Sequence, residues 1–197
     1  MKKLLITGFD PFDGATINPS WEAVKLLPDT VGEYEIHKLQ IPTVFGLAPR
    51  TVLEAAEKLQ PDVIISVGQA GTRPSVTPER IGINVRDARI TDNQGNQPKG
   101  EFIAPEGPAA YFATVDVNAM VTAMEQASVP STVSNSAGAF VCNDTLYSLL
   151  HHYAGTETKV GFIHVPYLPI QAKEGIPSLP LEEITKGLAA AIESIRI

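Results

Sequence analysis

The sequence predicts a three-layer α/β/α sandwich with a central twisted sheet that is mixed but largely parallel. Apolar runs rich in β-branched residues alternate with segments whose apolar residues recur at helical spacing, as in parallel sheets with helices on both faces. The run 62–71 is continuously apolar and ends in Gly, which is typical of a central strand covered on both sides. With no internal repeat, the 197 residues are expected to form one domain, 1–197.

The first part of the chain alternates regularly between strand and helix. Strands are expected at 2–9 and 34–42, before the one at 62–71. A helix is expected at 18–29, because Pro19 suits the first turn of a helix. Apolar residues at helical spacing predict another helix over 45–61.

The second part of the chain is less regular. Residues 79–90 alternate like a strand, whereas the Gly-, Pro- and Asn-rich residues 91–112 indicate an excursion or a flexible hairpin. A strand is expected at 131–138, where the chain runs out into small residues. The remaining predicted elements are helices at 116–127, 141–155 and 180–195 and a buried strand at 159–166.

The composition is that of a globular protein and excludes several classes of partner. Hydrophobic residues make up 44% and charged residues 19%, which is compatible with a sizeable core. The net charge of −7 argues against nucleic acid or an anionic membrane as partner, because phosphate groups require a basic face. The single cysteine, Cys142, can form no internal disulfide, which favours a reducing cytoplasm. The opening residues "MKKLLITGFDPF" indicate a first strand and not a signal peptide.

Polar and aromatic residues follow the predicted strands at their carboxyl ends, where open α/β sheets bind ligands. Cys142 and His164 reach this rim from separate segments, and histidine is the usual base that activates a thiol. Cys142 also falls in or near the first turn of a predicted helix, which favours its thiolate. The residues at the rim are Phe9, Asp10, Phe12, Asp13, Gln69, Arg73, Cys142 and His164.

Less specific interpretations of these residues remain open at this level. A lone cysteine is commonly a buried small hydrophobe, and His164 in an apolar strand is compatible with a core histidine. The stretch "GFDPFDG" is compatible with a plain turn, although two Phe residues there favour a packing partner or a ligand. No nucleotide-phosphate motif occurs, and the histidines are too scattered for a metal site, so no cofactor or metal is expected.

Four blocks of the sequence resemble the pyroglutamyl peptidase type I (pyrrolidone-carboxylate peptidase) family of intracellular cysteine peptidases. They are "TGFDPFDGATINPSWEAV", "PERIGINVRDARITDNQG", "NSAGAFVCNDTLY" and "VGFIHVPYLP". The resemblance runs from the first strand to about residue 169. Departures at Ala139, Thr91 and Ile170 concern loop geometry and leave the reaction class intact.

The resemblance implies a catalytic triad of Glu79, Cys142 and His164. Cys142 would be the nucleophile, His164 the base, and Glu79 the group that orients the imidazole. Arg89, in "DARI", matches a family residue of the oxyanion region. Taken without the resemblance, Glu79 and Arg89 would suggest a surface pair on a strand.

The resemblance also implies the substrate: peptides with an N-terminal pyroglutamyl (5-oxoproline) residue, cleaved after that residue through a thioacyl-enzyme. The ring is an uncharged lactam, so it requires apolar walls and amide partners in place of a carboxylate. Phe9 and Phe12 match the family's ring-flanking aromatics, Gln69 is expected to meet the lactam amide, and Asn18 is expected to support the pocket. A cytoplasmic homodimer or homotetramer is expected from the family.

Two other function classes compete with this hypothesis. A nucleoside-type phosphorylase on a similar sandwich would need a phosphate site, for which "GTRPS" supplies Thr72, Arg73 and Ser75. A non-catalytic module would keep the pocket without the chemistry, but an intact set of Glu79, Cys142 and His164 argues against it.

Overall fold

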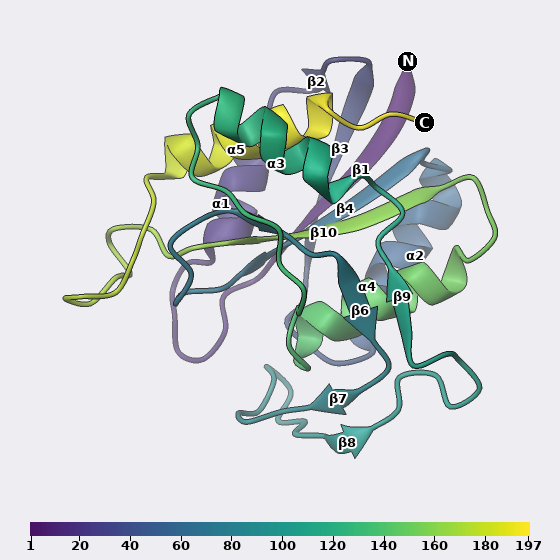
Figure 1. Ribbon diagram of the computed structural model, residues 1–197. Helices are drawn as coiled ribbons and strands as arrows, with labels where there is room; N and C mark the ends of the chain where they lie inside the picture. The colour runs from purple at the N-terminus through teal and green to yellow at the C-terminus, as the bar shows by residue number, and fades with distance from the viewer.

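A mixed six-stranded sheet runs through the centre of the computed structural model, which describes residues 1–197 (Figure 1). Its strand order is β2-β3-β1-β4-β10-β5. The central strands β3, β1, β4 and β10 pair in parallel, and the short edge strands β2 and β5 pair antiparallel to their neighbours. The predicted α/β class with a mixed, largely parallel sheet is therefore confirmed. The strands are β1 Lys2–Phe9, β2 Thr30–Val31, β3 Tyr34–Ile41, β4 Val63–Gln69, β5 Thr77–Pro78 and β10 Lys159–Val165.

Helices cover both faces of this sheet and complete the three layers (Figure 1). Alternate residues of β1 face opposite layers, because Leu4 and Ile6 pack in one apolar cluster and Leu5 packs in the other. The first cluster contains residues of α1, α3 and α5, and the second contains residues of α2 and α4. The helices are α1 Pro19–Leu26, α2 Leu47–Leu59, α3 Val117–Gln126, α4 Val141–His152 and α5 Leu181–Glu193.

The helix starts differ in how they are capped. Asn18 caps α1 by accepting a hydrogen bond from the Ser20 N–H, and Asp116 caps α3 through two such bonds. In contrast, α4 begins after Phe140 without a side-chain cap. Its first turn therefore retains uncapped N–H groups directly beside Cys142.

The predicted strand at 79–90 is wrong as one element. It is broken into β6 Ile81–Ile83 and β7 Arg86–Asp87, because the two halves pair with different partners. Those partners are β9 Ala110–Phe112 and β8 Lys99–Glu101, so the predicted excursion at 91–112 carries two short strands of its own. The β6–β9 ladder lies against α4, and the β7–β8 ladder lies farther from the main sheet (Figure 1).

The predicted strand at 131–138 is also wrong. This segment forms only isolated bridges, from Ser131 to Val76 and from Ser134 to Glu79. Its serine hydroxyls bond to the segment's own backbone, and such local bonds compete with a continuous ladder. The segment is therefore a loop that leads into α4.

None of the helices is both long enough and apolar enough to pass through a membrane.

Candidate active site

Cys142, His164 and Glu79 come together at one end of the sheet, from three different elements. Cys142 is the second residue of α4, His164 belongs to β10, and Glu79 directly follows β5. Cys142 and His164 line a cavity of about 340 Å³ at the carboxyl ends of β1 and β4. The remaining lining residues are Phe9, Phe12, Asn18, Thr43, Gln69, Ala70, Thr72, Arg73, Ser136, Ala137, Gly138 and Phe140.

Backbone pairing fixes His164 against Glu79. In the antiparallel pair of β5 and β10, Thr77 lies opposite His164, and the Glu79 N–H continues the ladder by donating to the Phe162 carbonyl at 2.9 Å. The His164 Nδ1 atom lies 2.6 Å from Glu79 Oε1, and both residues are buried. Because Nδ1 is occupied by the carboxylate, the second ring nitrogen, Nε2, is left for a reacting group.

Gly68 makes room for the sulfur of Cys142. A Cβ atom at Gly68 would lie 2.8 Å from Cys142 Sγ, so the sulfur rests directly on the backbone of β4. Gly68 is also the register partner of His164 in the parallel pair of β4 and β10. Paired residues of adjacent strands face the same side of a sheet, so the thiol and the imidazole share the face covered by α4.

The resting charges of this group follow from burial. Burial raises the pKa of the Cys142 thiol to about 12; the Glu79 charge also raises it, and the Arg73 charge lowers it. Burial lowers the pKa of His164 below 6.5, against the opposing effect of Glu79. Burial disfavours ionised Glu79, but the hydrogen bond and charge of His164, together with Arg73, lower the pKa of this carboxyl. At neutral pH the group is therefore a neutral thiol and a neutral imidazole beside a carboxylate.

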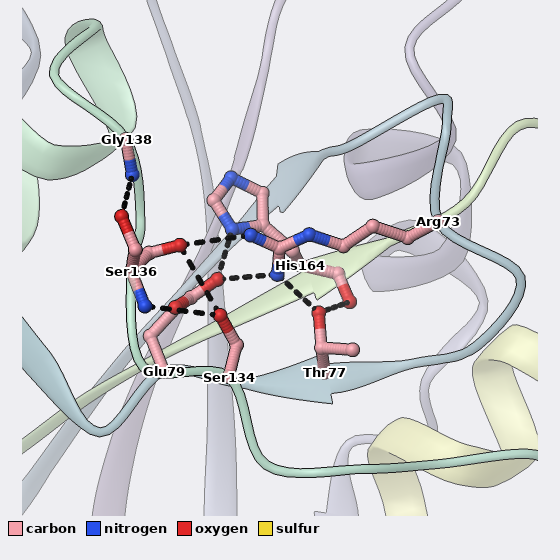
Figure 2. Close-up of polar contacts among 7 residues, drawn as sticks. All are labelled: Arg73, Thr77, Glu79, Ser134, Ser136, Gly138 and His164. Atoms are coloured by element: carbon pink, nitrogen blue, oxygen red, sulfur yellow. Dashed lines mark hydrogen bonds and ion pairs between the residues drawn. The ribbon is translucent and has the colours of Figure 1, made fainter.

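Arg73 joins this group from the loop between β4 and β5. Figure 2 shows its guanidinium and the His164 ring converging on the Glu79 carboxylate. Arg73 Nη1 donates to Glu79 Oε1 and to Thr77 Oγ1, both at 2.5 Å, and Nη2 donates to the Ser136 carbonyl at 2.9 Å.

Aromatic side chains also line the cavity. Phe9 is buried at the end of β1, and Phe12 lies in the loop that follows. Phe12 packs against Phe140 with ring centroids 6.1 Å apart, and Phe45 supports Phe140 edge-on at 5.1 Å. The cavity is therefore lined by aromatic rings as well as by the polar groups around Cys142 and His164.

Two amide side chains, Asn18 and Gln69, also line the cavity, and they differ in which hydrogen-bonding groups are left free. Asn18 is engaged within the protein, because its Nδ2 donates to the Asp10 carbonyl and its Oδ1 accepts from Ser20. Gln69 Oε1 accepts from Gln171 Nε2 at 3.1 Å, which leaves the Gln69 NH₂ group available as a donor. Gln69 thus can meet a ligand oxygen, whereas Asn18 holds the first loop in place.

Arg89 lies elsewhere. It is exposed and lines an adjoining groove, which shares Phe12, Gln69 and Thr72 with the cavity. It is not among the residues that line the cavity with Cys142. The interpretation of Glu79 and Arg89 as a surface pair is wrong, because Glu79 is fully buried and pairs with Arg73.

Sequence reasoning missed several contributors to the site. Gly68 and Gln171 gave no local signal, because their importance lies in contacts with Cys142 and Gln69 across the fold. The sequence places Arg73 on the rim but suggests for it only the role of a phosphate ligand. No group of three His, Cys, Asp or Glu side chains is arranged to hold a metal ion.

The chain is similar along nearly its whole length to known peptidases. A family model described as "Pyroglutamyl peptidase" matches residues 2–196. The sequence is 48% identical to a pyrrolidone-carboxylate peptidase of Bacillus cereus, over 98% of this chain and 92% of that one. It is 49% identical to pyrrolidone-carboxylate peptidase 1 of Photorhabdus laumondii, with the same coverage.

Solved structures show the same similarity in three dimensions. The crystal structure of pyroglutamyl peptidase I from Bacillus amyloliquefaciens matches with a TM-score of 0.95 at 47% identity, over 98% of this chain and 96% of that one. The pyrrolidone carboxyl peptidase from Thermococcus litoralis matches with a TM-score of 0.94 at 36% identity, over 98% and 93%.

Proposed function

This chain belongs to the pyroglutamyl peptidase family, and we propose that Cys142, His164 and Glu79 carry out its reaction. The activity is that of a cysteine peptidase that removes an N-terminal pyroglutamyl residue. The observation that supports the residue assignment most strongly is the 2.6 Å contact between His164 Nδ1 and Glu79 Oε1, beside a cavity that also holds the thiol. Because this contact engages Nδ1, Nε2 of the neutral imidazole is left to accept the thiol proton.

Acylation starts from the neutral pair. As Cys142 Sγ attacks the pyroglutamyl carbonyl carbon, His164 Nε2 takes the thiol proton, because the raised pKa of Cys142 leaves little thiolate at rest. Glu79 stabilises the imidazolium that forms. The tetrahedral intermediate then expels the amine, to which His164 returns the proton, and a thioester remains.

Deacylation repeats these roles with water. His164 takes a proton from a water molecule, whose oxygen attacks the thioester carbon. The carbon–sulfur bond breaks, the proton returns to Cys142 through His164, and free pyroglutamic acid leaves. The net reaction consumes one water and needs no cofactor or metal.

Stabilisation of the oxyanion is proposed to begin at the start of α4. Its first turn has no side-chain cap, so backbone N–H groups beside Cys142 are available to a developing negative charge. The role of Arg89 in the oxyanion region stays a proposal, and Arg89 would have to move in from the adjoining groove on substrate binding.

The pyroglutamyl ring is proposed to lie between Phe9, Phe12 and the supporting Phe140. The free NH₂ group of Gln69 is suited to the lactam carbonyl, and Asn18 secures the loop that carries Phe12. Proline lacks that carbonyl and brings a charged nitrogen, so its binding would leave buried polar groups of the pocket unpaired. Each unpaired group disfavours binding by about 1–3 kcal/mol.

Several wider assignments belong to the same proposal. The chain is proposed to act as one domain in the cytoplasm, where its free, partly exposed cysteine would stay reduced. It is proposed to form a homodimer or homotetramer, and the exposed Phe102 and Phe112 provide apolar surface for a contact between copies. Light scattering on an eluting size-exclusion peak would measure the assembly.

The direct test is hydrolysis of a fluorogenic pyroglutamyl amide, with the matching prolyl amide as control substrate. The unmodified chain should release the fluorophore from the first and not from the second. Cys142→Ala should abolish the release, and full activity in that variant would exclude Cys142 as the nucleophile.

The phosphorylase alternative is disfavoured by the contacts of Arg73. Its Nη atoms already donate to Thr77, Glu79 and Ser136, and the neighbouring carboxylate of Glu79 would repel a phosphate. Turnover that depended on added phosphate would reopen this alternative.

A further inference from the structure

Arg73 is the one lysine or arginine among the residues that line the catalytic cavity. It stands in the loop between β4 and β5, and its side chain is 26% exposed. Its partner Glu79 is completely buried, so this is a cation at the cavity wall aimed at a carboxylate within the protein. The proposed chemistry does not use Arg73, and its place therefore requires a separate explanation.

The three partners of Arg73 come from two segments of the site (Figure 2). Glu79 orients the imidazole, Thr77 is the ladder partner of His164, and Ser136 lies in the loop that leads into α4. A guanidinium is planar and directs its N–H groups in a fixed fork, so its three contacts hold two segments, Thr77 with Glu79 and the loop at Ser136, in one relative position.

The oxygen that Arg73 contacts is the one that His164 contacts. Glu79 Oε1 lies 2.5 Å from Arg73 Nη1 and 2.6 Å from His164 Nδ1. The Glu79 side chain therefore cannot rotate away from the imidazole without losing its ion pair with Arg73.

We propose that Arg73 is a positioning residue of the catalytic site, which locks Glu79 against His164 and ties the loop at Ser134–Gly138 to the same carboxylate. This inference rests on the proposed roles of Cys142, His164 and Glu79. The Ser136 carbonyl accepts a hydrogen bond from Arg73, and the Ser136 hydroxyl accepts one from the Gly138 N–H. These bonds connect Arg73 to the part of the cavity wall just before α4.

The charge of Arg73 has a second consequence for the same group. The charged or titratable groups that share the cavity end with His164 are Glu79, Arg73 and the Cys142 thiol. Arg73 lowers the pKa of His164 and of Cys142, in opposition to Glu79, which raises both. Without Arg73, the charge of Glu79 would raise the pKa of His164, so the imidazole would stay protonated to higher pH. It would also raise the pKa of Cys142 and so leave less thiolate.

The experiment compares Arg73→Gln and Arg73→Lys with the matched control Arg80→Gln. Arg80 also holds this loop, through a 2.8 Å bond from Nε to Asn135 Oδ1, but its side chain makes no hydrogen bond or ion pair with Glu79 or His164. For each variant, kcat and KM on the pyroglutamyl amide are measured from pH 5 to 9, together with the rate of Cys142 alkylation by iodoacetamide.

In Arg73→Gln, kcat should fall about 100-fold, as expected when reacting groups lose their alignment. The acid limb of kcat/KM should move to higher pH by about one unit, and alkylation at pH 7 should slow. Arg73→Lys keeps the charge but not the fork, so its kcat should fall less and its acid limb should stay in place. Arg80→Gln should match the unmodified chain in all these measurements.

Three results would overturn the proposal. One is an Arg73→Gln variant with unchanged kcat and acid limb, and another is an Arg80→Gln variant with the same losses. The third is full kcat in Arg73→Lys. This measurement also tests the proposal if Arg73→Gln does not fold. Any of these would leave Cys142→Ala inactive, whereas activity in Cys142→Ala would refute the proposed function itself.

Discussion

Two fully buried carboxylates, Glu79 and Asp144, each pair with a partly exposed arginine, yet their surroundings differ. Asp144 accepts from Arg86 at 2.8 Å and from the Gly46 N–H at 2.7 Å, so its donors are an arginine and a backbone amide. Glu79 accepts from Arg73 and from the ring of His164, which can itself lose or gain a proton. The pair at Asp144 holds α4 to β7 and to the turn before α2, whereas the pair at Glu79 meets the imidazole that we propose as the base.

The pKa directions express the same contrast. Burial raises the pKa of Asp144, and Arg86 opposes this without overcoming it. Burial acts on Glu79 as well, but the hydrogen bond and charge of His164, with smaller contributions from Ser134 and Arg73, outweigh it and lower the pKa. A buried acid–arginine pair is therefore a structural tie by default, and a titratable third partner makes it a candidate for catalysis.

The largest effect is expected from exchanging each carboxylate for its amide. Glu79→Gln should lower kcat by about 10⁴-fold, because the amide cannot hold the productive tautomer or stabilise the imidazolium. Asp144→Asn should keep kcat in the folded protein but destabilise it by about 3–5 kcal/mol, since Arg86 loses its partner. Steady-state kinetics and urea unfolding of both variants measure the contrast, and equal losses of kcat would contradict it.

Gly68→Ala tests the geometry on the Glu79 side without altering either carboxylate. The added methyl group would lie 2.8 Å from both Cys142 Sγ and the Phe162 ring, so the sulfur must shift. A displacement of this kind should cost about 100-fold in kcat/KM.

The matched control for Gly68→Ala is Gly187→Ala in α5, where the methyl group would crowd Val129 at 3.0 Å, far from the thiol. That variant should change the midpoint of thermal unfolding and not kcat/KM. Wild-type kinetics in Gly68→Ala would show that the sulfur does not depend on this glycine.

The two carboxylates should also affect stability with opposite signs in acid. Glu79 has a lowered pKa in the folded state, so its contribution is present above its unfolded value of 4.5 and is lost as the pH falls further. Asp144 has a raised pKa when folded, so the folded state binds its proton first and gains relative stability as the pH falls toward the unfolded value of 3.8. Unfolding free energies measured from pH 3 to 6 should therefore show a weaker acid loss in Glu79→Gln and a stronger one in Asp144→Asn than in the unmodified chain.

The pH dependence of activity follows from His164. Burial lowers its pKa, so the imidazole stays neutral and able to accept the thiol proton to below pH 6.5. The acid limb of kcat/KM should accordingly lie below pH 6.5. A limb above that value would mean that the Glu79 charge dominates over burial.

The smallest effect is expected from a chelator, which should affect neither the Glu79 site nor the Asp144 site. Glu79 and Asp144 accept from protein donors, and the proposed reaction uses no metal. Activity should be unchanged after dialysis against EDTA. Loss of activity that zinc restores would point to metal chemistry instead.

Local pattern predicted the elements that carry their own signal. The continuous apolar run before Gln69 and the one around His164 became β4 and β10, because strands buried on both faces exclude polar residues. The predicted strand at 131–138 failed because its serines bond locally, and its backbone meets residues 76–80 that are distant in sequence. The position of Cys142 is therefore set by the start of α4 and by the close approach of the Gly68 backbone, and not by a strand that precedes it.

The amino-acid sequence alone predicts the α/β class, the position of Cys142 and His164 at one rim and, from its four blocks, the family. These follow from periodicity and from motifs, both of which are local properties of the chain. The three-dimensional fold is needed to show that Glu79 is buried against His164, that Arg73 contacts the same Glu79 oxygen, and that Arg89 lies in the adjoining groove. This is because a buried charge needs partners from other elements of the fold. The periodicity of one segment does not indicate which partners it will meet.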